Sequence, residues 1–122
     1  MILVVDDEAP VRELIQLILQ RDGHEVLNAG SGPESLAIMQ NTRPDLLVTD
    51  IVMPDMTGLA LAAQAHRLRP DVPVLFISGF ASEFEEELSG AVCLSKPFTS
   101  TQLLASVTDA LGSVPISGRR LA

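Results

Sequence analysis

The feature that most constrains the fold of this chain is a set of short apolar runs, each ending abruptly on a polar residue. The run at residues 46–49 ends on Asp50, and a loop rich in proline, aspartate and glycine follows at once. Because the run lacks the polar alternation of a half-buried strand, we expect a fully buried strand of a parallel sheet. Open parallel sheets place ligand sites at the carboxyl ends of their strands, where Asp50 would lie. Helix capping is the ordinary role of such an aspartate, but Thr57 is better placed to cap the next helix.

Three other apolar runs end in the same way. They cover residues 2–5, 74–77 and 92–95, and the residues that follow them are Asp6 with Asp7, Ser78, and Lys96. Any one of these endings alone is an ordinary solvated strand end. If the four strands are parallel, however, three acids, a hydroxyl and an ammonium group meet at one edge of one sheet. This complementary chemistry predicts a functional site at that edge.

Helical patterns alternate with the strand candidates. Pro10 suits the first turn of a helix that Gly23 ends, and Thr99 with Gln102 forms a capping box for the last helix. The most polar strand candidate, residues 24–29, belongs at a sheet edge. Five strand–helix alternations predict an α/β fold with a parallel sheet and right-handed crossovers.

Two further expectations concern burial. The apolar stripe of the first helix is expected to consist of Val11, Leu14, Ile15 and Ile18. The two histidines, His24 and His66, have no partner cluster in the sequence and are predicted to be solvated surface residues.

Composition narrows the class of protein further. The chain of 122 residues is 47% hydrophobic but only 3% aromatic, which favours an aliphatic core between buried strands and helices. A formal net charge of −8 disfavours direct binding to nucleic acid or to anionic membranes. No apolar stretch approaches the ~20 residues of a membrane span, and no signal peptide is evident. The single cysteine, Cys93, excludes an internal disulfide and suits a reducing compartment, so a cytoplasmic protein is expected.

Four sequence motifs, in order and at their spacings, resemble the receiver domain of the two-component response-regulator family. They are Val-Val-Asp-Asp-Glu at residues 4–8, Asp-Ile-Val-Met-Pro-Asp-Met-Thr-Gly at 50–58, Ile-Ser-Gly at 77–79 and Ser-Lys-Pro-Phe at 95–98. The resemblance implies a doubly wound, five-stranded parallel sheet with the flavodoxin-like strand order 2-1-3-4-5. The resemblance extends from residue 2 to about residue 112, so we expect a receiver domain over residues 1–112. Residues 113–122 show no periodicity and are expected to form a flexible tail.

The resemblance assigns roles to the polar residues. Asp50 would be the phosphoacceptor, with Ser78 and Lys96 contacting the phosphoryl group, and the peptide bond between Lys96 and Pro97 would be cis. The metal ligands would be Asp6, Asp7, Asp50 and the backbone carbonyl of Val52. Three crowded carboxylates need a cation or protonation, and such hard oxygen ligands suit Mg²⁺. No cluster of Cys and His offers a zinc site instead.

The predicted function is a phosphorylation-controlled switch, not a turnover enzyme, fed by a histidine kinase or a histidine phosphotransfer protein. Whether the chain is a stand-alone regulator or part of a hybrid kinase or larger regulator stays open, as does a weak or phosphorylation-dependent dimer. An aspartyl-nucleophile phosphatase is a second interpretation, but Val52 occupies the position where such enzymes carry a second aspartate. A receiver used only for docking is a third, although all five acidic, hydroxyl and lysine positions are present.

Two departures from the family pattern concern the output face rather than phosphorylation. Cys93 stands where the family usually has an aromatic switch residue, and the interval from Ser78 to Lys96 is ~4 residues short, about one helical turn. We therefore expect a shortened fourth helix and signalling through ordering of residues 82–90. The apolar Val52 and Phe80, which flank the phosphoryl group in the family, predict slow self-dephosphorylation.

Overall fold

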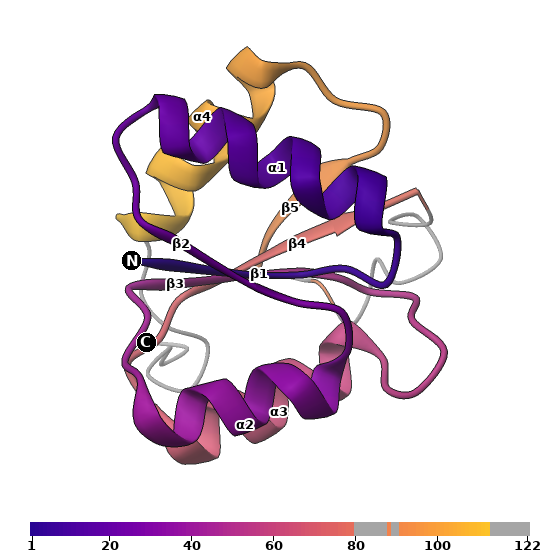
Figure 1. Ribbon diagram of the computed structural model, residues 1–122, viewed down its shortest axis with the longest axis vertical. Helices are drawn as coiled ribbons and strands as arrows, with labels where there is room; N and C mark the ends of the chain where they lie inside the picture. Colours follow the sequence, from indigo (N-terminus) through magenta and orange to yellow (C-terminus); the bar gives the residue numbers. More distant parts are fainter. Residues whose placement is uncertain (80–87, 89–90, 113–122) are drawn as a thin grey trace.

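The computed structural model of the chain describes residues 1–79, 88 and 91–112. Its centre is one sheet of five parallel strands in the order β2-β1-β3-β4-β5 (Figure 1). The strands are β1 (Ile2–Val5), β2 (Val26–Ala29), β3 (Leu46–Asp50), β4 (Val74–Ser78) and β5 (Val92–Ser95). The predicted flavodoxin-like order is thus confirmed. Apart from the buried Leu88, the predicted short helix at residues 82–90 lies outside the described residues, and so does the predicted tail at 113–122.

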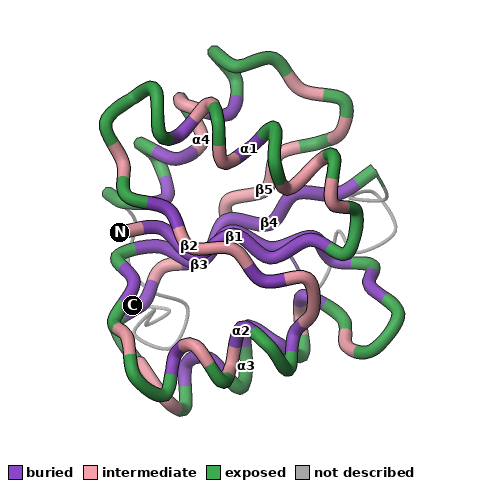
Figure 2. Tube along the Cα trace, in the orientation of Figure 1, coloured by how far each residue is buried: buried purple, intermediate pink, exposed green. Residues whose placement is uncertain are grey.

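Four described helices cover the two faces of this sheet. They are α1 (Ala9–Arg21), α2 (Gly32–Asn41), α3 (Gly58–Leu68) and α4 (Ser100–Leu111). Helices α1 and α4 lie on one face, and α2 and α3 lie on the other (Figure 1). Alternate strand residues therefore enter two separate cores: Leu3 and Val5 pack with the α2–α3 layer, whereas Ile2 and Val4 pack with the α1–α4 layer. The three central strands, β1, β3 and β4, are buried at every residue, whereas the edge strands β2 and β5 are only partly buried (Figure 2).

The helix ends follow the signals in the sequence. The Thr57 hydroxyl accepts a hydrogen bond from the Ala60 amide at 3.1 Å, which fixes the start of α3. Thr99 and Gln102 form the predicted capping box at the start of α4. Gly23 has a φ of +92°, a conformation that favours glycine, directly after α1. In the described part of the chain, no helix combines the length and the apolar character that a bilayer-spanning segment needs.

Two burial predictions, for His66 and Leu14, were wrong. The His66 side chain is buried at 9% exposure, and its Nε2 atom lies 2.9 Å from the Val72 carbonyl oxygen. It lies on the same face of α3 as Ala62 and Ala65, so its ring fills the core while its polar atom is satisfied. Leu14, expected on the buried stripe of α1, is 49% exposed, because α1 turns Ile15 toward the sheet. The other histidine, His24, is partly exposed, with its Nε2 atom 3.4 Å from Asp22 Oδ2.

Candidate functional site

Strand register brings the predicted polar residues to one edge of the sheet. Val5 pairs with Thr49 across β1 and β3, so Asp6 follows β1 directly beside the end of β3 at Asp50. Ser78 pairs with Ser95 across β4 and β5, and the Lys96 amide donates to the Ser78 carbonyl oxygen at 3.1 Å. The strand ends are therefore level with one another. At these strand ends, the side chains of Asp6, Asp50 and Lys96 meet in space.

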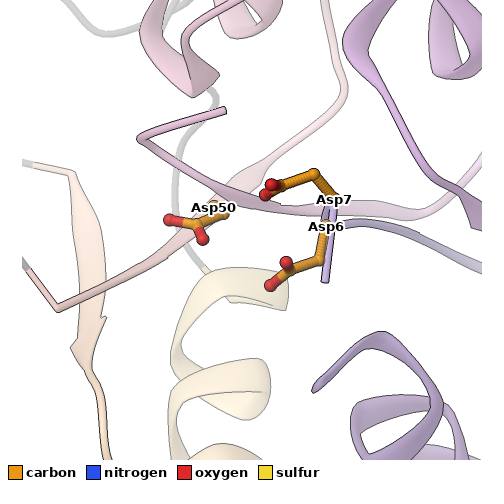
Figure 3. Close-up of side chains that lie close together, drawn as sticks. All are labelled: Asp6, Asp7 and Asp50. Atoms are coloured by element: carbon orange, nitrogen blue, oxygen red, sulfur yellow. The ribbon is translucent and has the colours of Figure 1, made fainter. Parts of the chain in front are cut away.

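Three aspartates form an acidic cluster at this edge. One carboxylate oxygen from each of Asp6, Asp7 and Asp50 lies within 4.8 Å of those of the other two. Figure 3 shows the Asp6 and Asp7 side chains at the end of β1 projecting toward the side on which Asp50, at the end of β3, lies. Asp6 and Asp50 are buried at 1% and 6% exposure, whereas Asp7 is exposed. The cluster is thus open to solvent on the Asp7 side.

Lys96 supplies positive charge to the cluster. Its Nζ atom lies 2.8 Å from Asp50 Oδ2, 3.2 Å from Asp6 Oδ2 and 3.8 Å from Glu8 Oε1. Burial alone would lower the pKa of Lys96, but the hydrogen bond to Asp50 and the charges of both aspartates raise it above its ordinary value. Lys96 therefore stays an ammonium ion at neutral pH.

The pKa of Asp6 is raised above its ordinary value by its surroundings in the cluster. Burial raises its pKa, and the charge of Asp50 raises it further, against the opposing effects of the Glu8 amide and Lys96. The Glu8 amide donates to Asp6 Oδ1 at 2.9 Å. The ionised form of Asp6 is thus disfavoured unless more positive charge arrives.

The loop after β3 holds Asp50 by backbone contacts. Asp50 Oδ1 accepts from the amides of Ile51 at 2.7 Å and Val52 at 3.4 Å. The Gly58 amide donates to the Ile51 carbonyl oxygen at 2.7 Å, which closes the loop. A Cβ atom at Gly58 would lie only 2.1 Å from the Asp50 carbonyl oxygen. The loop therefore approaches β3 so closely that only glycine fits.

The other predicted site residues lie less centrally. Ser78 is fully buried at the end of β4. Val52 is 45% exposed and contacts Asp50 through its amide. The implied cis peptide bond between Lys96 and Pro97 is present.

Sequence reasoning missed two residues of the site. Glu8 approaches Lys96, and Arg12 Nη1 donates to the Asp6 carbonyl oxygen at 2.6 Å. Arg12 lies one helical turn after Glu8, in a helix that begins at the site. This position was the only feature of the sequence that could have indicated a role for Arg12 at the site.

An apolar hollow of about 350 Å³ adjoins the cluster. It is lined by Val11, Leu14, Lys96, Pro97 and Phe98. A larger hollow of about 520 Å³ lies at the opposite end of the strands, between the loops that precede β3 and β4. Because that hollow is remote from the acids and from Lys96, the smaller one is the hollow relevant to this site.

Comparison with known proteins identifies the family. Residues 2–108 match the model of the response regulator receiver domain. The chain is 33% identical over 110 residues to the alkaline phosphatase synthesis transcriptional regulatory protein PhoP of Bacillus subtilis, covering 87% of this chain and 46% of PhoP. It is 36% identical over 116 residues to the sensor kinase CckA of Brucella abortus, covering 90% of this chain and 12% of CckA.

Solved structures agree with this assignment. The response regulator protein TrrA of Thermotoga maritima, in complex with Mg(2+)-BeF, superposes with a TM-score of 0.81 at 32% identity, covering 89% of this chain and 96% of that one. The chain therefore belongs to the response regulator receiver family, whose members are phosphorylation-dependent signalling switches and not classical enzymes. It spans about half or less of the length of the curated relatives it matches.

Proposed function

We propose that this receiver accepts a phosphoryl group on Asp50 from a histidine kinase or a histidine phosphotransfer protein, in a step that depends on Mg²⁺. The observation that carries the proposal is the contact between Lys96 Nζ and Asp50 Oδ2 at 2.8 Å, beside two further acids at the same sheet edge. A buried carboxylate next to a fixed cation is a nucleophile held at a site that can neutralise phosphoryl charge.

The acidic cluster fits a magnesium ion. When ionised, the three aspartates carry three negative charges, and Lys96 adds one positive charge. The formal charge of these four residues is therefore −2. Hard carboxylate oxygens with open solvent on one side suit Mg²⁺, which keeps several of its waters. These three side chains and the Val52 carbonyl would hold the ion. When bound, it would neutralise the acids and the phosphoryl oxygens.

The transfer step itself needs little covalent chemistry from the protein. An Asp50 carboxylate oxygen attacks phosphorus, the phosphorus–nitrogen bond of the donor phosphohistidine breaks, and its electron pair stays on the imidazole nitrogen. The amides of Ile51 and Val52 orient the carboxylate through Oδ1. Lys96 would then pair with a phosphoryl oxygen, and Ser78 would turn to donate a hydrogen bond to another.

The apolar hollow beside Lys96 supports a protein donor. A phosphohistidine can reach Asp50 only if its carrier covers the surface around the site, and this hollow adjoins the site through Lys96. Leu14 on its rim is 49% exposed, and Leu17 on the same helix is 45% exposed. Leu14→Asp should therefore slow transfer from the cognate donor protein while labelling by acetyl phosphate stays unchanged, because acetyl phosphate needs no docking surface.

Two alternative functions are less well supported. An aspartyl phosphatase needs a general acid near its nucleophile, and the apolar, 45% exposed Val52 cannot serve as one. A receiver that only docks would have no need for the acids and Lys96 together. Steady hydrolysis of a chromogenic phosphate ester would favour the phosphatase, whereas the switch predicts none.

Intact mass spectrometry tests the proposal. Acetyl phosphate with Mg²⁺ should add one phosphoryl group, the acetate leaving as the phosphorus–oxygen bond breaks. The Asp50→Asn variant and a sample treated with a chelator should stay unlabelled. Equal labelling of the Asn variant, or labelling that a chelator does not affect, would contradict the proposal.

We also propose that residues 1–112 form the receiver domain and that residues 113–122 form a tail. The single thiol at Cys93 supports a cytoplasmic location. A dimer that forms weakly or only after phosphorylation is consistent with the 41–49% exposure of Leu14, Leu17 and Leu111. Sedimentation of the free and phosphorylated protein would test it.

A further inference from the structure

Arg12 makes a contact at the site that the proposed chemistry leaves unused. Its Nη1 atom donates to the Asp6 backbone carbonyl oxygen at 2.6 Å. Arg12 belongs to the first turns of α1, where its own amide donates to the Glu8 carbonyl oxygen at 3.0 Å. Its side chain therefore reaches back from the helix to the peptide group that joins Asp6 to Asp7.

The peptide group between Asp6 and Asp7 determines where the Asp7 side chain starts. Asp6 is anchored on its other side, since its amide donates to the Ala29 carbonyl oxygen at 3.2 Å and its Oδ1 atom accepts from the Glu8 amide. The Asp7 carboxylate is exposed, and within residues 1–79, 88 and 91–112 no hydrogen bond to it is found. As far as the described residues show, the Asp7 backbone therefore holds this side chain near the other two acids.

The loop after β2 lies beside the Arg12 guanidinium group. A Cβ atom at Gly30 would lie 3.5 Å from Arg12 Nη1 and 3.6 Å from Glu34 Oε1, so these two side chains flank Gly30. Glu34 Oε1 in turn accepts from the Gly30 amide at 2.6 Å. Arg12 thus lies between the loop after β1 and the loop after β2, with its side chain half-buried and bonded to the Asp6 carbonyl oxygen.

We infer that Arg12 is a positioning residue for the metal site: by holding the peptide between Asp6 and Asp7, it orients the Asp7 carboxylate toward Asp6 and Asp50. The inference rests on the proposed function, because it assigns Arg12 to the Mg²⁺ site. Groups that orient metal ligands typically change metal affinity by about 10–100-fold when they are lost. Arg12 acts through a neutral carbonyl group and not by touching the metal or the phosphoryl group.

Calorimetric titration of Mg²⁺ into the metal-free protein tests the inference, since a chain without Trp or Tyr gives no indole or phenol signal. Arg12→Gln should raise the dissociation constant at least tenfold. Arg12→Lys, which keeps a donor and the charge, should raise it by threefold or more but less than Arg12→Gln. The matched control Arg21→Gln removes the same charge from the exposed end of α1 and should stay within twofold of the wild-type value.

Other results of the titration would contradict either the role of Arg12 or the proposed function. A change of less than threefold in Arg12→Gln, or an equal loss in Arg21→Gln, overturns the inference in favour of no role or of a general charge effect. If Arg12→Gln does not fold, as judged by circular dichroism, Arg12→Lys carries the test, and a change below threefold overturns the inference. Failure of the wild-type protein to bind Mg²⁺ contradicts the proposed function itself, so the two failures are distinguishable.

Discussion

Replacing Gly58 with alanine should damage both the stability of the domain and the phosphoacceptor site. The new Cβ atom would lie 2.1 Å from the Asp50 carbonyl oxygen, 3.0 Å from the Asp50 carbonyl carbon and 3.0 Å from Ile51 Cα. All three contacts are with backbone atoms, so no rotation of a side chain can relieve them. Either α3 moves outward or the end of β3 moves, and the bond from the Gly58 amide to the Ile51 carbonyl oxygen lengthens.

The magnitude follows from these contacts. Overpacking of a tight site costs about 1–3 kcal/mol, and weakening one backbone hydrogen bond costs about 0.5–1.5 kcal/mol. Restricting the unfolded chain offsets about 0.4–1 kcal/mol. We therefore expect Gly58→Ala to lower the free energy of unfolding by about 2–3 kcal/mol and Tm by about 10 °C or more. Displacement of the Asp50 carboxylate should slow labelling by acetyl phosphate by about 10–100-fold.

Gly112→Ala is the matched control. A Cβ atom at Gly112 would meet the Thr108 and Asp109 carbonyl oxygens at 3.6 and 3.8 Å, which are ordinary contacts, and its φ of −88° suits alanine. That variant should be neutral or more stable by about 0.4–1 kcal/mol. Urea denaturation followed by circular dichroism measures both variants. A Gly58→Ala protein within 0.5 kcal/mol of wild type, about the range of a neutral surface substitution, would refute the steric reasoning.

Three further predictions concern the charge, the lifetime and the output of the switch. Without Mg²⁺ at neutral pH, Asp6→Asn should be more stable than wild type by on the order of 1 kcal/mol, because it removes a buried charge. Because the pKa of Asp6 is raised in the folded state, the folded wild type binds more protons than the unfolded chain, and it gains stability as pH falls. The stability difference between Asp6→Asn and wild type should therefore shrink as pH falls toward 3.8, the ordinary pKa of the group. A difference in Tm between the two proteins that stays constant from pH 7 to pH 4 would contradict this. Val52→Asn should shorten the lifetime of the phosphorylated protein, because a polar side chain can orient the attacking water; an unchanged or longer lifetime in a phosphate-release assay would remove the argument. Residues 82–90 should gain amide-exchange protection only in the presence of a phosphate mimic, and full protection in the free protein would exclude an ordering mechanism.

The sheet and the acidic cluster were predictable because their signals are local. The buried strands β1, β3 and β4 are runs of mainly apolar residues, and each run ends on the polar residue that the structure places at the carboxyl edge. Parallel register then brings Asp6 beside Asp50 without further information, because Val5 pairs with Thr49. The edge position of β2 was also readable, since its polar residues suit partial exposure.

The rotation of the helices about their axes was harder to predict. A stripe with a period of 3.6 residues indicates a helix, but which residues at the margin of the stripe face the sheet depends on packing with neighbours. Leu14 thus turned outward, and His66 turned inward onto the Val72 carbonyl oxygen. The contact of Arg12 with the Asp6 carbonyl oxygen was not predicted for a related reason. The position of an arginine in the sequence does not indicate which backbone carbonyl its side chain will reach.

Locating the phosphoryl group within the chain tests the central claim most directly. The protein is treated with acetyl phosphate and Mg²⁺, reduced with borohydride, which converts an aspartyl phosphate to homoserine, and digested for tandem mass spectrometry. The account predicts homoserine at position 50 and at no other aspartate, and none in a sample treated with a chelator before acetyl phosphate. Homoserine at Asp6 or Asp7 in place of Asp50, or a stable phosphoryl group on a serine or histidine, would contradict the assignment of Asp50 as the phosphoacceptor.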